Sequence, residues 1–288
     1  MKITRIKPGC SWTDVNEIVE FRSINEFVDY IQKTPTNQLF ADVKTLASKD
    51  KNSCRTKFTQ TQSYEEAVEL LQGGWKTEAQ KLTKKFEVTK KDMKLEKQVK
   101  SVLDVVGFQP VVPLYLTGVP MNMVNRKPVN CKNKIVTINY ARCYSAGVDA
   151  QKIQQEAIKC LQIIKMIEDK GYRTNLNLIM CTGNALLKIR LKSSNERLNI
   201  SKLAFPICHP AMFRRLFFRF VEVHPSYNHE RFKWGYGSVI SDSLVEKALK
   251  SNERKEIMLS SLLGAVGYGT SSYKEVNEIA LEKYLENL

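Results

Sequence analysis

The sequence has few of the residues that build metal centres and active sites, and it has no long apolar run. Its three histidines are His209, His224 and His229, and its seven cysteines include no Cys-x-x-Cys pair. An odd number of scattered cysteines argues against a disulfide framework. The most apolar stretch, 158–167, is interrupted by lysine and glutamine, so no segment is suited to crossing a bilayer. The first residues lack the apolar core of a secretory signal. We therefore expect an intracellular protein with no membrane contact and no cofactor.

Acidic residues are also scarce, and their absence is concentrated in the middle of the chain. The formal net charge is +15, from 45 lysines and arginines against 30 acidic residues. No acid occurs between Asp104 and Asp149, and a second acid-free interval runs from Asp169 to Glu196. A clustered positive surface attracts polyanions, chiefly nucleic acid. The alternative is that the lysines serve solubility alone.

The clearest structural pattern lies between residues 135 and 191. Ile135–Ala141 and Thr174–Cys181 are apolar strand candidates, and an amphipathic helix is expected over Asp149–Lys170. Ala185–Leu191 is a third strand candidate. The connection Arg142–Val148 follows the first strand, where α/β domains usually bind ligands, yet it offers no acid, histidine or phosphate cradle. This pattern predicts an α/β fold with a mostly parallel sheet flanked by helices.

The remaining chain suggests two parts. Residues 1–104 are predicted to form a smaller, mainly helical N-terminal region, and residues 105–288 the α/β domain. Ser23 with Glu26, and Ser63 with Glu66, have the spacing of capping boxes at helix starts. Four prolines within 107–134 exclude a long helix there and indicate an extended segment.

Catalytic or metal-binding patterns are weak. His224 and His229 are separated by Pro225, which breaks the helical geometry of known zinc motifs. Cys208 adjoins His209, but sequence neighbours seldom form a nucleophile and base pair. An enzyme would need a site assembled from distant residues around these histidines. Met212–Phe220 predicts a core helix with Arg214, Arg215 and Arg219 on its polar side.

Several short motifs resemble an uncharacterised family of bacteriophage and prophage proteins. They are Phe58-Thr-x-Thr61-x-Ser63-Tyr-x-Glu-Ala67, Pro113-x-Tyr115-x-x-Gly118-x-Pro120, Tyr144-Ser-Ala-Gly147 and Cys208-His-Pro-Ala-x-x-Arg214-Arg215. The resemblance covers most of the chain and carries no assigned activity. It implies expression in the cytoplasm of a bacterial host during phage growth, or a place in the virion.

The strand–loop–helix–strand unit also resembles the start of a von Willebrand factor A-type domain. That family binds a divalent cation through Asp-x-Ser-x-Ser after its first strand. The matching positions are Ala141, Cys143 and Ser145, so the carboxylate is missing. Hard cations need such oxygen ligands, so no metal is expected. The resemblance leaves a metal-free protein contact as the implied use.

The leading hypothesis is a non-enzymatic phage accessory protein that binds DNA or RNA through its basic centre. Predicted phosphate contacts are Arg126, Lys127, Lys132, Lys134 and Arg142, followed by Lys84, Lys85, Lys90 and Lys91 in a lysine-rich tract that also suits a solvated helix face. The alternatives are a protein–protein interaction module, as a virion component or an inhibitor of a host defence factor, and an enzyme with an unrecognised site.

Overall fold

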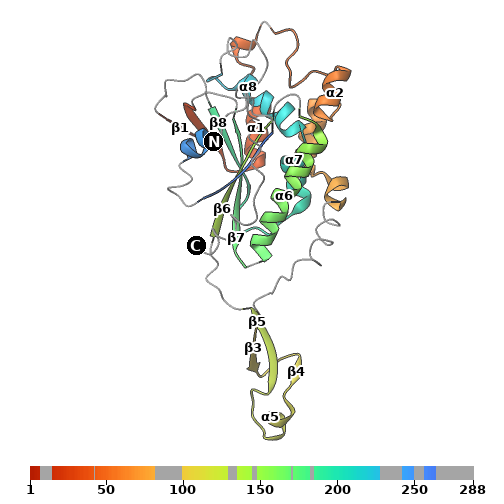
Figure 1. Cartoon of the computed structure of the whole chain (residues 1–288), viewed down its shortest axis with the longest axis vertical. Coiled ribbons are helices and arrows are strands. Elements are labelled where there is room, and N and C mark those ends of the chain that lie inside the picture. Colours follow the sequence, from red (N-terminus) through yellow and green to blue (C-terminus); the bar gives the residue numbers. More distant parts are fainter. Residues whose placement is uncertain are drawn as a thin grey trace.

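One mixed β-sheet organises the fold. Among the residues that the structure describes, six strands form this sheet in the order β1-β2-β8-β7-β6-β9 (Figure 1). The structure is a computed structural model, and it describes residues 1–6, 15–41, 43–81, 99–128, 135–144, 148–169, 171–181, 185–227, 242–249 and 256–263. The strands are β1 (Lys2–Arg5), β2 (Glu17–Phe21), β6 (Ile135–Tyr144), β7 (Arg173–Cys181), β8 (Ala185–Lys192) and β9 (Ile257–Leu263). Strand β2 runs parallel to β8, and β6 runs parallel to both β7 and β9, whereas β1 with β2 and β7 with β8 are antiparallel. The prediction of an α/β fold with a mostly parallel sheet is confirmed.

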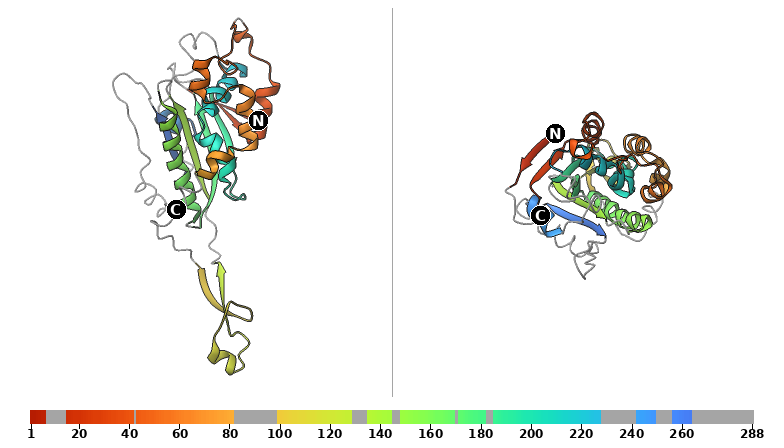
Figure 2. Two further views of the ribbon diagram at one scale, coloured as in Figure 1. Left: turned by 90° about the vertical axis from the view of Figure 1, so that its right-hand side faces the viewer. Right: turned by 90° about the horizontal axis from the view of Figure 1, so that it is seen from above.

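The sheet buries both faces, but unequally. Because side chains alternate along a strand, Leu178 and Met180 of β7 enter the large core, while Ile179 and Cys181 enter a smaller one on the opposite face. Helices cover the large face, and α9 (Asp242–Leu249) contributes Val245 and Leu249 to the small one. The helices of the large face are α1 (Ile24–Lys33), α3 (Tyr64–Gly73), α6 (Ala150–Asp169), α7 (Ile200–Cys208), the π-helix η2 (Met212–Phe217) and α8 (Phe218–Val223) (Figure 2).

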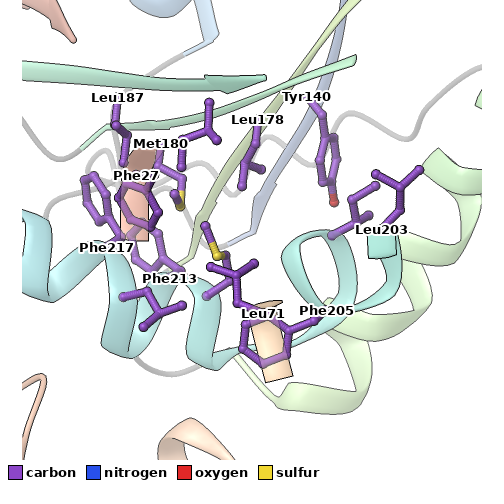
Figure 3. Packing of buried hydrophobic residues seen from close by; sticks show 14 of the residues in the cluster. Phe27, Leu71, Tyr140, Leu178, Met180, Leu187, Leu203, Phe205, Phe213 and Phe217 are labelled. Carbon is purple, nitrogen blue, oxygen red and sulfur yellow. The ribbon is translucent and has the colours of Figure 1, made fainter. Parts of the chain in front are cut away.

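The large core is built from residues distant in sequence. Figure 3 shows Phe27 of α1 and Phe213 and Phe217 of η2 beneath Met180 and Leu187 of the sheet. The rings of Phe213 and Phe217 stack with centroids 5.1 Å apart. Full burial of such side chains contributes on the order of 1.5–3 kcal/mol each. The N-terminal helices are therefore part of the same core as the central strands.

Local sequence signals explain the two capped helices. The Ser23 hydroxyl accepts from the Glu26 amide at 3.2 Å, and the Ser63 hydroxyl accepts from the Glu66 amide at 3.1 Å. Each bond satisfies an amide that the first turn of a helix leaves without a partner. Both predicted helix starts are confirmed.

The arginines of η2 and α8 are buried, although helical periodicity predicts them on a polar side. Arg214, Arg215 and Arg219 are at most 5% exposed. Arg215 donates to the carbonyl oxygens of Ser48 and Asp50 at 3.0 Å, and to others nearby. The predicted core helix is confirmed, and its basic side is buried as well, because these guanidinium groups donate to backbone carbonyls, mostly of the N-terminal segment, instead of to water.

A small β-arm projects from the main body (Figures 1 and 2). It comprises residues 99–128, with the sheet order β3-β5-β4 and a short helix beside it. Its elements are β3 (Val99–Asp104), β4 (Gln109–Pro110), α5 (Val112–Leu116) and β5 (Met123–Pro128). None of residues 101–125 is buried. Within residues 107–128, the described part of the proline-rich segment, the helix is the five-residue α5, so the expectation of no long helix is confirmed there.

The arm also bears on the predicted boundary at residue 105. That position lies within the arm, just after β3 ends. Strand β2, from the N-terminal region, pairs with β8 from the C-terminal one. The central sheet therefore draws strands from both sides of the boundary, and whether 1–104 and 105–288 fold separately stays a prediction.

Candidate anion-binding cleft

A cleft lies where two parallel strands end. The register runs from Glu17 opposite Ala185 to Phe21 opposite Ile189, so β2 and β8 direct their carboxyl ends to the same edge. Strand β2 passes through Arg22 and Ser23 into α1, and β8 passes through a short loop into α7. Open α/β sheets place ligands at the carboxyl ends of their parallel strands. The topology therefore makes this edge a candidate binding site.

Two helices begin at the cleft. Ser23 caps α1, and the side-chain oxygen of Asn199 accepts from the Lys202 amide at 3.2 Å to cap α7. Ile24 and Asn25, in the first turn of α1, also line the cleft. The amides of a first helical turn have no partners within the helix, and the helix dipole makes this end positive. Both helix starts therefore favour an anion, and the start of α7 does so more, because Glu26 in the first turn of α1 already accepts from the Arg22 amide at 2.6 Å, whereas the first turn of α7 has no acid.

Four exposed cations add to this field. Arg22, Arg190, Arg197 and Lys202 line the cleft, which has a volume of about 480 Å³. Within the described part of the chain, none of the four forms an ion pair. These side chains keep their charge available for a ligand.

The other charged groups of the lining already have partners. Lys192 is buried, with its ammonium group 2.6 Å from a carboxylate oxygen of Glu168. Glu196 is the sole carboxylate among the described lining residues, and it accepts from the Ser193 amide at 3.0 Å. The cleft therefore carries a net positive charge.

A close approach of two helices shapes the apolar floor. Leu71 of α3 and Leu203 of α7 are buried beneath the cleft lining. Gly74 ends α3 with φ +83°, and a Cβ there would lie 2.9 Å from the Ser201 carbonyl oxygen. Glycine permits both the backbone conformation and the contact with α7. The start of α7 is thereby held next to the end of α3.

The lining suits charge recognition. Among the described lining residues there is no aromatic ring, histidine or cysteine. Guanidinium and ammonium groups with backbone amides are the usual donors to phosphate oxygens. Stacking on bases needs aromatic faces, which these residues do not supply. The arrangement can therefore bind phosphate groups without reading base identity.

The predicted phosphate-binding residues are not gathered in this cleft. Arg126 and Lys127 are on β5 of the arm, opposite Ser101 and Lys100 of β3. The others, apart from Arg142, lie outside the described residues: Lys132, Lys134, Lys84, Lys85, Lys90 and Lys91.

Arg142 has a structural role instead. It is fully buried, and its terminal nitrogens donate to the carbonyl oxygens of Pro206 at 2.5 Å and His209 at 2.8 Å. Burial lowers the pKa of Arg142 to about 10, so the group stays charged at neutral pH. Its assignment as a solvent-facing phosphate contact is wrong, because β6 continues through Tyr144 and carries Arg142 into the core.

The Cys208 and His209 neighbours do not form a reactive pair. Burial raises the pKa of the Cys208 thiol to about 12. Burial, together with the charge of Arg142, lowers the pKa of His209 to about 3, and His209 Nδ1 accepts from the Ala211 amide. A neutral thiol is a poor nucleophile.

The other histidines give no clear site either. His224 is buried 3.3 Å from a carboxylate oxygen of Glu17, and His229 lies outside the described residues. Across the described ranges, no three metal-ligating side chains cluster. No helix in those ranges has the length and apolarity needed to span a membrane.

Sequence reasoning missed the cleft, although two signals pointed to it. The second acid-free interval contains Arg190, and the Ser23 capping motif directly follows a strand. Counting charges gives no reason to treat Arg190 and Lys188 differently. In the structure, however, the ammonium group of Lys188 is 3.2 Å from a carboxylate oxygen of Glu20 on the neighbouring strand. Only the strand register distinguishes the neutralised cation from the available one.

The fold and the cleft together define a mixed α/β protein with a positively charged cleft at the carboxyl ends of two parallel strands. The chain belongs to the family described as Domain of unknown function (DUF7192), which matches residues 7–288. No curated protein and no solved structure matches it.

Proposed function

We propose that this protein is a non-enzymatic phage accessory protein that binds nucleic acid, and that the cleft at the ends of β2 and β8 contacts the phosphate backbone. The bacteriophage context rests on the motif resemblance, and binding in a bacterial cytoplasm is part of the same proposal. Arg126 and Lys127, near the C-terminal end of β5, are candidates for secondary contacts.

One observation carries the proposal: four cations without ion-pair partners among the described residues surround two helix N-termini. Like charges repel, so gathering them lowers stability unless an anion joins them. Each contact with a phosphate releases a condensed counterion, and this release drives binding. The cleft is therefore expected to bind a polyanion, which makes several phosphate contacts, more tightly than it binds a single small anion.

The lining predicts how the nucleic acid is held. Arginine forks donate to two phosphate oxygens at once, and Arg22, Arg190 and Arg197 supply three such groups. Because phosphate contacts carry no sequence information, binding is expected to depend weakly on base sequence.

A filter-binding titration of the nuclease-treated chain tests the proposal. Short single-stranded and duplex DNA and RNA are titrated at low and at moderate salt. We expect saturable binding to at least one form, with affinity falling steeply as salt rises. Absence of salt-sensitive binding to every form would reject nucleic-acid binding.

A matched pair of variants locates the binding. Arg22→Gln with Arg190→Gln removes two cleft charges, and Lys33→Gln with Lys81→Gln removes two charges whose groups pair with Asp29 and Glu78. The cleft variant should lose affinity and the control should keep it. Equal losses would show that net charge, and not the cleft, determines binding.

A protein–protein interaction module is the second candidate, because the arm exposes apolar side chains. Tyr115 is 66% exposed and Leu116 is 78% exposed. Soluble monomers seldom expose large contiguous apolar patches. The arm and the cleft lie on different parts of the molecule, so both functions can coexist.

A further inference from the structure

The tip of the arm, residues 103–121, is an apolar surface without a core of its own. Nine of its large apolar residues are more than one-third exposed, led by Leu116, Val106 at 74% and Tyr115. Its described structure is held by backbone hydrogen bonds, such as that from the Phe108 amide to the Val124 carbonyl at 3.0 Å, and by bonds between side chains and the backbone, such as that from the Asn122 amide group to the Val119 carbonyl at 2.8 Å. Small sheets without an apolar face packed against something are marginally stable in water. The tip is therefore expected to be covered.

We propose that the arm tip associates with the tip of a second copy of this chain, forming a symmetric dimer. This inference rests on the arm being a contact element and not on nucleic-acid binding.

The first argument is area. The nine exposed residues present roughly 800 Å², taking a fully exposed large residue as about 150 Å², the lower end of the range for aromatic side chains, because four of the nine are valines. A stable interface of standard size buries about 800 Å² on each partner. In a two-fold dimer the same patch serves both subunits, so the tip supplies enough surface for each side.

The second argument is charge. The tip carries one charged side chain, Asp104 at its edge, whose carboxylate accepts from the Val105 amide at 2.8 Å. Residues 105–125 contain no charged residue, in a chain of net charge +15. Two such chains repel each other through their bodies, so a self-contact is favoured where charge is absent and the bodies are held apart. The arm meets both conditions, because its tip lies at the end remote from the main sheet (Figures 1 and 2).

The same composition disfavours other occupants. A membrane-surface segment usually carries lysine or arginine together with tryptophan, and residues 105–125 have none of these. A partner with an acidic surface would bind to lysine or arginine side chains, and the tip has none of these. A second apolar surface that is uncharged over residues 105–125, such as the same tip of another copy, fits it best.

Sedimentation equilibrium of the full, nuclease-treated chain tests the proposal. The experiment is run at about 0.5 M salt, where bridging through nucleic acid is screened. The expected result at micromolar concentration is a mass twice the 33.0 kDa of the chain, falling towards one copy on dilution. A mass of one copy at all concentrations would overturn the proposal and favour another protein or a lipid surface as the occupant.

Matched variants locate the contact. Leu116→Asp and Tyr115→Asp should each weaken association by about 100-fold or more, because a carboxylate without a partner would be buried at the centre of the contact. Ile3→Asp changes an exposed apolar residue of β1, 45% exposed, and should leave the dimer intact. Unchanged dimerisation in both arm variants, or loss in Ile3→Asp alone, would place the contact elsewhere. Thermal unfolding of each variant checks that the main body is intact, and failure of nucleic-acid binding would leave this result unaffected.

Discussion

Removing two cleft charges should lower the salt sensitivity of nucleic-acid binding by a calculable amount. The four available cations are Arg22, Arg190, Arg197 and Lys202. If each neutralises one phosphate of duplex DNA, the slope of log affinity against log salt is about −3.6, at about −0.9 per contact. A rise from about 50 to 200 mM salt then weakens binding by about 150-fold. In the Arg22→Gln, Arg190→Gln variant the slope becomes about −1.8, and the same rise costs about 12-fold.

The assay is a series of fluorescence-anisotropy titrations with one labelled duplex at four salt concentrations. Both replaced side chains are exposed, so the substitutions should not alter folding. The variant with Lys33→Gln and Lys81→Gln, which has the same net charge, should keep the original slope, because its charges are already paired. Equal slopes for the cleft variant and the original chain would refute the assignment of phosphate contacts to the cleft.

Three further predictions concern the scaffold. Replacing Arg215 by Met leaves buried carbonyl oxygens without donors and should lower the free energy of unfolding by about 3 kcal/mol, as measured by urea titration. The control Arg190→Met changes an exposed side chain and should alter the free energy of unfolding little. The folded chain holds His209 neutral, whereas the unfolded chain protonates it near pH 6.5, so His209 should lower the free energy of unfolding by about 1.4 kcal/mol per pH unit as the pH falls from about 6 to 4. His209→Asn should remove this part of the pH dependence while keeping an acceptor for the Ala211 amide, and the part due to the buried His224, whose pKa is also lowered, should remain. A Cβ at Gly107 would lie 2.3 Å from the Val124 carbonyl oxygen, so Gly107→Ala should distort the arm and weaken dimerisation in sedimentation without lowering the thermal midpoint of the main body.

The central strands and helix were predictable because their buried apolar residues recur at the spacing of a strand or a helix. The expected strand Thr174–Cys181 corresponds to β7, and the expected helix Asp149–Lys170 to α6. Their apolar spacing reflects contact with one core, which is a local property of each segment. Two features could not be predicted in this way: β7 pairs with β8 in antiparallel orientation, and β2 pairs with β8. Strand pairing depends on contacts between segments, which the spacing of apolar residues within one segment does not show.

The functional residues were harder to predict, because a sequence does not show which cations are buried or paired. Arg142 and Arg190 both occur in acid-free intervals, yet one is buried against carbonyl oxygens and the other is exposed at the cleft. Lys188 forms an ion pair with Glu20, and Lys192 forms one with Glu168; both carboxylates lie on other elements of the fold. Only the fold decides which charges remain available for a ligand.

Arginine modification mapped by mass spectrometry tests most directly whether the cleft binds the phosphate backbone. The chain is treated with phenylglyoxal, with and without a saturating DNA or RNA oligonucleotide. Bound nucleic acid should protect Arg22, Arg190 and Arg197, and should leave the exposed Arg5 and Arg173 unprotected. Unchanged modification of the three cleft arginines, with protection at other positions, would contradict the assignment of this cleft as the nucleic-acid site.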